Sequence, residues 1–75
     1  MNKLPSHEEI DLMKNRYPVG TRVEMVHCAD LYSTVPAGVQ GTVNFVDDML
    51  TLHVNWDNGS SLGLIVGEDD FSVVS

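Results

Sequence analysis

Among the side chains of this 75-residue chain that can bind zinc, the candidate ligands are His27, Cys28, Asp30 and His53. Their spacing contains no Cys-x-x-Cys or His-x-x-x-His pair, so it gives weak support to a metal site. Cys28 is also the single thiol, but neighbouring strand residues such as His27 and Cys28 point to opposite faces. The sequence contains no nucleophile elbow, phosphate loop or zinc-protease helix. We therefore expect a protein that is not an enzyme and needs no cofactor, in which Cys28 is a small, partly buried hydrophobe.

The second chemically interesting group is acidic. The chain has a formal net charge of -7, and its four basic residues all lie within the first 22 positions. The acids that follow, with no Lys or Arg among them, are Glu24, Asp30, Asp47, Asp48, Asp57, Glu68, Asp69 and Asp70. They lack the spaced ligands of a calcium loop. Because basic groups supply most nucleic-acid affinity, this balance disfavours DNA, RNA and anionic lipid and favours a basic partner.

A helix is predicted near the N-terminus, where Ser6 is a good N-cap and Glu9 completes a capping box. Pro18 and Gly20 end it. Its apolar face is formed by Ile10, Met13 and Tyr17, at the spacing i, i+3, i+7. Such a helix of about three turns is marginal alone in water, so we expect it to pack on the rest of the domain. The alternative is that the helix contacts a partner protein.

Everything after Gly20 has the pattern of short strands and tight turns. The expected strands are residues 21–28, 39–46, 50–56, 60–66 and 71–74. Alternation should place His27 on the same side of the first strand as Val23 and Met25, and Val43 and Phe45 on one side of the second. Five short strands and one long early loop predict a mainly β fold, a small five-stranded SH3-like barrel of residues 21–75 with a short helix in residues 1–20, all in a single domain.

The Asn-Gly pair at 58–59 invites a two-residue turn. A three-residue loop of residues 57–59, with Gly59 left-handed, instead sets Leu52 opposite Leu64 and gathers the apolar side chains on one face. Because a one-residue slip moves every side chain to the other face, we expect burial to select this longer loop. It also turns Ile65 outward, where the predicted helix would cover it.

Four segments together carry a family resemblance. They are Tyr-Pro-Val-Gly-Thr-Arg-Val-Glu-Met (17–25), Gly-Thr-Val-Asn-Phe-Val-Asp-Asp (41–48), Val-Asn-Trp-Asp-Asn-Gly-Ser-Ser-Leu-Gly-Leu (54–64) and a Gly-acidic-Phe end (67–71). In this order they resemble an uncharacterised family of small domains in proteins of bacterial phages and integrative mobile elements. The resemblance implies fold and genomic setting. The chain departs from that family at Met49-Leu50, where a glycine is expected.

A shorter pattern, Gly-Thr-Val (41–43) followed by Val-Asn-Trp-Asp-Asn-Gly-Ser (54–60), is similar to the SH3-like domain of mind-bomb-type ubiquitin ligases. That likeness implies peptide binding by analogy. The chain lacks the basic residue expected soon after the hairpin. A single cysteine, no signal-peptide core and no long apolar run suit the cytoplasm, here that of a bacterial host cell.

Trp56 and Asp57 lie at a strand end, and Tyr32 lies in a loop expected to overhang them. Trp and Tyr are enriched in binding hot spots, although Trp56 capping the core is the alternative. The predicted partner-binding residues are Trp56, Asp57, Tyr32, Asp47, Asp48, Asp69 and Asp70. We expect a non-enzymatic protein- or peptide-binding module, acting as a small inhibitor of a host defence protein. The alternatives are a nucleic-acid-associated SH3-like module and a small zinc-binding regulatory protein.

Overall fold

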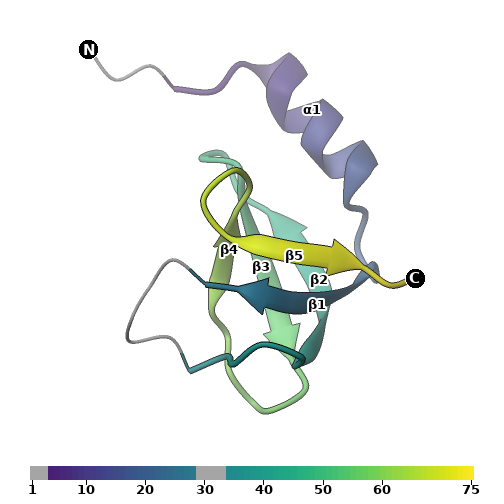
Figure 1. The fold of residues 1–75 in the computed structure, drawn as a ribbon. Coiled ribbons are helices and arrows are strands. Elements are labelled where there is room, and N and C mark those ends of the chain that lie inside the picture. Colours follow the sequence, from purple (N-terminus) through teal and green to yellow (C-terminus); the bar gives the residue numbers. More distant parts are fainter. Residues whose placement is uncertain (1–3, 29–33) are drawn as a thin grey trace.

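The computed structural model describes residues 4–28 and 34–75, so two predicted residues, Asp30 and Tyr32, lie outside the described part. The elements are α1 (His7–Arg16), β1 (Arg22–His27), β2 (Gln40–Val46), β3 (Thr51–Trp56), β4 (Gly63–Ile65) and β5 (Asp70–Val73) (Figure 1). The strands form one antiparallel sheet in the order β4-β3-β2-β1-β5. The predicted mainly β class with one short N-terminal helix is confirmed.

The sheet is strongly curled. Its edge strands β4 and β5 are joined directly by residues 66–69. In a flat sheet these edges would lie about 19 Å apart, four strand spacings of about 4.8 Å. The connection is a tight turn, in which the amides of Glu68 and Asp69 both donate to the carbonyl of Ile65, at 3.0 and 2.9 Å. A turn this tight requires the two edges to approach each other, and Figure 1 shows β1 and β5 running across the direction of β3 and β4.

Helix α1 begins as predicted. The Ser6 hydroxyl accepts a hydrogen bond from the amide of Glu9 at 3.2 Å, and the Glu9 carboxylate accepts one from the amide of Ser6 at 3.3 Å. Ile10 is buried on the inner face of the helix. The sheet contact of α1 is with β2, and Ile65 on β4 is 46% exposed. The prediction that the helix would cover Ile65 is therefore wrong.

The β3–β4 hairpin has the predicted register, with Leu52 opposite Leu64. Both side chains are fully buried. The loop has three residues, and Gly59 is left-handed with φ +90°. Strand β4 is shorter than predicted, and the carbonyl of Leu62, just before it, accepts a hydrogen bond from the indole of Trp56 at 2.8 Å.

Two irregularities overturn the simple alternation expected in β1 and β2. The β2–β3 register shifts between Val43 and Phe45, so Val43 and Val46 face the core while Phe45 is 47% exposed. A second shift, after Met25, leaves His27 exposed at the end of β1. An extra residue in one strand reverses the alternation beyond it. The prediction that Phe45 shares a side with Val43 and the prediction that His27 shares a side with Val23 and Met25 are both wrong.

Candidate functional site

Trp56 is part of the core. It is 3% exposed, and its indole nitrogen donates to the carbonyl of Leu62 at 2.8 Å. Gly41 lies opposite Trp56 in the β2–β3 ladder, where an added Cβ would lie 2.9 Å from the indole ring. A side chain so enclosed offers a partner almost no surface. The arrangement agrees with the alternative to partner binding, in which Trp56 caps the core.

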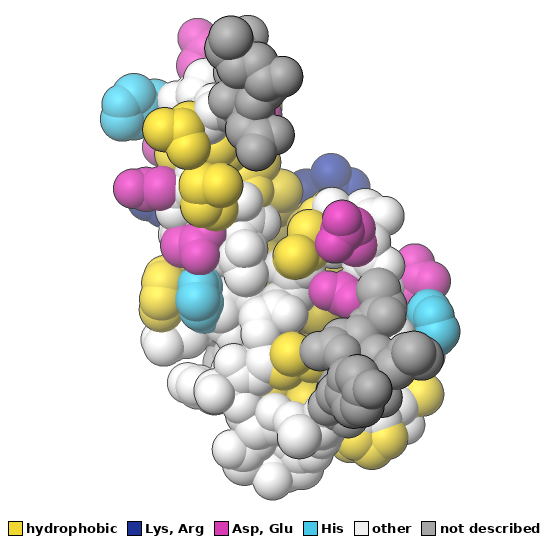
Figure 2. All heavy atoms as spheres, turned by 90° about the vertical axis from the view of Figure 1, so that its left-hand side faces the viewer, with side chains coloured by type: hydrophobic (Ala, Val, Ile, Leu, Met, Phe, Trp, Pro, Cys, Tyr) yellow, Lys and Arg dark blue, Asp and Glu magenta, His cyan; other side chains and the backbone are white. Residues whose placement is uncertain are grey.

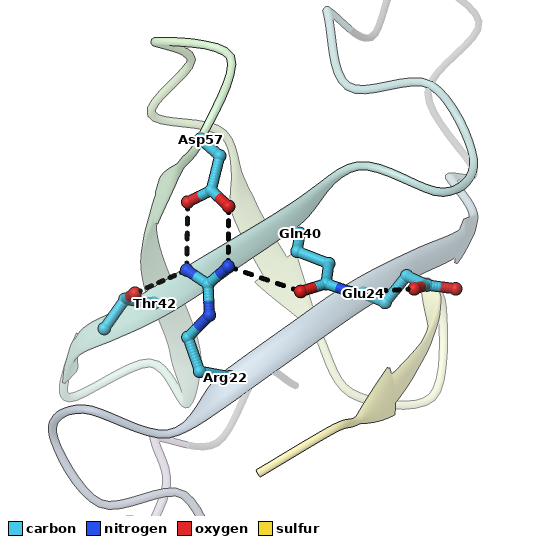
Figure 3. Close-up of polar contacts among 5 residues, drawn as sticks. All are labelled: Arg22, Glu24, Gln40, Thr42 and Asp57. Atoms are coloured by element: carbon cyan, nitrogen blue, oxygen red, sulfur yellow. Dashed lines mark hydrogen bonds and ion pairs between the residues drawn. The ribbon is translucent and has the colours of Figure 1, made fainter.

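Asp57 is held by Arg22, which reaches it from β1 across β2 on the same face of the sheet (Figure 3). The two guanidinium nitrogens donate to the two carboxylate oxygens at 2.9 and 2.6 Å. The same guanidinium donates to the Thr42 hydroxyl at 2.8 Å and to the Gln40 side chain at 3.3 Å. Gln40 in turn donates to Glu24 at 3.1 Å. This bidentate geometry is the strongest form of carboxylate recognition by arginine.

The pairing has an electrostatic consequence. The hydrogen bond from Arg22 lowers the pKa of Asp57, and the same bond raises the pKa of Arg22. Asp57 is therefore charged but neutralised by a partner in its own chain. Sequence reasoning missed Arg22; the available signal was that Arg22 is the last basic residue and alternates outward on β1.

The predicted acidic residues lie at two ends of the sheet. Thr51 pairs with Ile65, so the β2–β3 and β4–β5 connections leave the sheet at the same end (Figure 1). Asp57 follows β3 and lies at the opposite end. The structure thus brings Asp47 and Asp48 to the same end as Asp69 and Asp70, and it separates them from Asp57.

Asp47 builds the β2–β3 turn. Its carboxylate accepts the amides of Met49 and Thr51 at 2.9 and 3.0 Å and lies 2.8 Å from Nε2 of His53. Burial opposes ionisation, but the hydrogen bonds from His53 and the two amides outweigh it and lower the pKa of Asp47. The His53 ring also stacks on Phe45, with centroids 4.2 Å apart and planes 10° apart. His53 is therefore engaged in the fold.

Asp69 also has a structural role, since its carboxylate accepts the amide of Ile65 at 2.9 Å. The exposed acids at this end are Asp48, Glu68 and Asp70. Sequence reasoning treated all the acids alike, because it could not tell those that accept local backbone amides from those that face solvent.

Exposed apolar side chains accompany these acids. Met49 is 62% exposed and Val66 37% exposed, beside the half-exposed Ile65. Figure 2, which faces the left-hand side of Figure 1, shows hydrophobic and acidic side chains next to one another on that face of the molecule. We define the turn-end surface as Asp48, Met49, Ile65, Val66, Glu68 and Asp70. Residues 47–51 and 65–70, which carry it, contain no Lys or Arg.

Two hollows flank α1. The smaller, of about 220 Å³, adjoins the β2–β3 turn and is lined by Glu9, Leu12, Met13, Arg16 and Leu50. The larger, of about 500 Å³, is lined by Lys14, Tyr17, Pro18, Val19, Phe45 and Val46. As far as the described residues show, Lys14 is the one charged side chain that lines this groove. The positive charge of Lys14 would repel the basic partner that the acidic composition favours.

The candidate metal ligands that the structure describes do not converge. His27 is on β1 and His53 on β3, with β2 between them. In residues 4–28 and 34–75 no group of three or more His, Cys, Asp and Glu side chains could hold a metal ion. Cys28 is partly buried against the core, as expected for a small hydrophobe.

The family to which the chain belongs is assigned from a match over most of its length. A family described as a domain of unknown function (DUF4314) matches residues 6–74. The chain belongs to this family. The match covers α1 and all five described strands, so the DUF4314 domain includes the helix as well as the sheet. No curated protein and no solved structure matches the chain. None of the described helical residues forms a helix with the length and hydropathy to cross a membrane.

Proposed function

We propose that this DUF4314 domain is a non-enzymatic protein- or peptide-binding module whose partner is both apolar and basic. The turn-end surface is the observation that supports it: Met49, Ile65 and Val66 are exposed among acids that no basic residue of the same segments neutralises. Exposed apolar patches with a polar rim mark interaction sites. Acidic surroundings steer a basic partner and suppress acidic ones.

The proposal includes a fold and a setting. The curled five-stranded sheet supports an SH3-like barrel, with the turn-end surface at one end of its strands. In the phage or mobile-element setting that the resemblance implies, the partner is a host protein and the domain is a small inhibitor of it. The nucleic-acid alternative is disfavoured because Arg22, the one basic residue of the strands, is bound by Asp57.

Two labelled peptides test the proposal, one of alternating leucine and lysine and one of alternating leucine and glutamate. We expect fluorescence anisotropy to detect binding of the leucine–lysine peptide alone, with an affinity that falls as salt screens the acids. Changing Asp48→Asn and Met49→Ser together should weaken binding about tenfold, which corresponds to about 1.4 kcal/mol.

A matched control separates this surface from net charge. The pair Asp11→Asn and Val26→Thr also removes one exposed acid and one exposed apolar side chain, but from α1 and β1. Its affinity should equal that of the wild type. Equal binding of both peptides, or equal losses in the two double variants, would contradict the proposal.

A further inference from the structure

The two central hairpins have the same turn geometry. In the β2–β3 turn the amide of Leu50 donates to the carbonyl of Asp47 at 3.1 Å, and the amide of Asp47 donates to the carbonyl of Thr51 at 3.0 Å. In the β3–β4 turn Gly59 and Trp56 make the equivalent bonds, at 2.9 and 3.0 Å. This kind of three-residue loop requires its last residue to be left-handed.

Leu50 is an exception at that position. Its φ is +64°, and it is the one non-glycine residue with positive φ among the described residues. The other left-handed positions are occupied by Gly20, Gly38, Gly59 and Gly67. A leucine is disfavoured there because its Cβ crowds the backbone, whereas glycine is not. The β2–β3 turn therefore has a leucine at the position where the β3–β4 turn has a glycine.

The turn does not depend on the leucine side chain. The carboxylate of Asp47 already accepts the amides of Met49 and Thr51, which fixes the path of the loop. What the leucine adds is a side chain that lines the hollow beside α1, together with Leu12 and Met13. Leu12 is itself 69% exposed, so the apolar surface runs from the turn onto the helix.

We infer that Leu50 is a partner-contact residue, held on strained backbone so that its side chain lines the hollow between the β2–β3 turn and α1. Strained residues persist mainly where they serve a function. This inference rests on the proposed function and extends the turn-end surface by one apolar subsite. The hollow carries one acid, Glu9, and one base, Arg16, so the group it admits is an uncharged apolar side chain of the partner, next to the partner's basic residues.

The test uses Leu50→Gly and Leu50→Asn, because both residues tolerate the left-handed conformation. We expect both variants to melt at or above the wild-type temperature and to keep the amide protection of α1. Both should bind the leucine–lysine peptide about tenfold more weakly. Leu50→Ala keeps the strain but shortens the side chain, so it should melt below the other two variants and bind equally weakly.

Two results would overturn the inference. If both variants melt lower and lose protection of α1, the leucine serves helix docking rather than a partner. If their peptide affinity equals that of the wild type, Leu50 makes no contact. Failure of the wild type to bind the peptide would instead refute the proposed function. Because the inference rests on that function, it would fall with it, and the melting temperatures would then show only whether the left-handed Leu50 strains the turn.

Discussion

Replacing Gly41 with alanine tests the closeness of packing around Trp56. A Cβ at this position would lie 2.6 Å from Cγ1 of Val54, 2.9 Å from Cε3 of Trp56 and 3.0 Å from the carbonyl oxygen of Asn55. The first two belong to buried side chains and the third to the backbone of the paired strand. None of them can move aside without shifting the core.

The expected effect is the difference between two opposing terms. Replacing glycine by alanine stabilises a compatible site by about 0.4–1 kcal/mol, because it restricts the unfolded chain. Overpacking a close-packed core costs about 1–3 kcal/mol. Because the added Cβ also meets a backbone atom, we expect the cost of Gly41→Ala to lie near the upper end of this range. We expect a net loss of about 2 kcal/mol, which for a domain of this size is a fall in Tm of about 8–16 °C.

Urea unfolding followed by the fluorescence of Trp56, the only tryptophan, measures this loss by linear extrapolation. Gly63→Ala is the control, because its Cβ would meet Cγ2 of Thr51 at 2.7 Å and backbone only at 3.6 Å. A side-chain methyl can rotate away, so we expect a change within about 1 kcal/mol. A Gly41→Ala protein as stable as wild type, or less perturbed than Gly63→Ala, would refute the reasoning.

Three further substitutions probe single interactions. Gly59→Ala meets open space but keeps φ at +90°, so strain alone should lower the urea-derived stability by about 1–2 kcal/mol. Trp56→Phe removes the donor to Leu62, and the loss of this hydrogen bond from a part-buried carbonyl should lower stability by about 1–3 kcal/mol in thermal melts followed by circular dichroism. Asp47 has a lowered pKa, so its stabilisation is present above the unfolded value of 3.8 and is lost as pH falls through the folded value. Asp47→Asn should therefore destabilise the domain at neutral pH and flatten the acid limb of its melting profile; an unchanged acid limb would count against the turn contacts.

Much of the fold could be predicted because local chemistry and burial specify it. The Ser6–Glu9 capping box needs only neighbouring residues. The Leu52–Leu64 pairing follows from the rule that a one-residue slip exposes a whole apolar face. Phe45 and His27 were misplaced because register shifts depend on how strands bend around the core, and simple alternation contains no sign of them.

The site was harder to predict, because proximity in sequence does not determine burial or pairing. Trp56 and Asp57 are adjacent, yet one closes the core and the other binds Arg22 from a distant strand. The absence of the glycine that the family resemblance predicts at Met49-Leu50 could be read from the sequence. Its consequence, a left-handed Leu50, needed the backbone geometry.

The placement of β5 also determines the order in which the domain can assemble. Strand β1 pairs with β5 through residues far apart in the chain, from Val23↔Val73 to His27↔Asp70. Closing so long a loop is slow relative to forming the β2–β3–β4 hairpins. During folding, β1 therefore keeps one unpaired edge after the hairpins have formed, until β5 pairs with it. For that interval the folding chain exposes a strand edge that can pair with other chains.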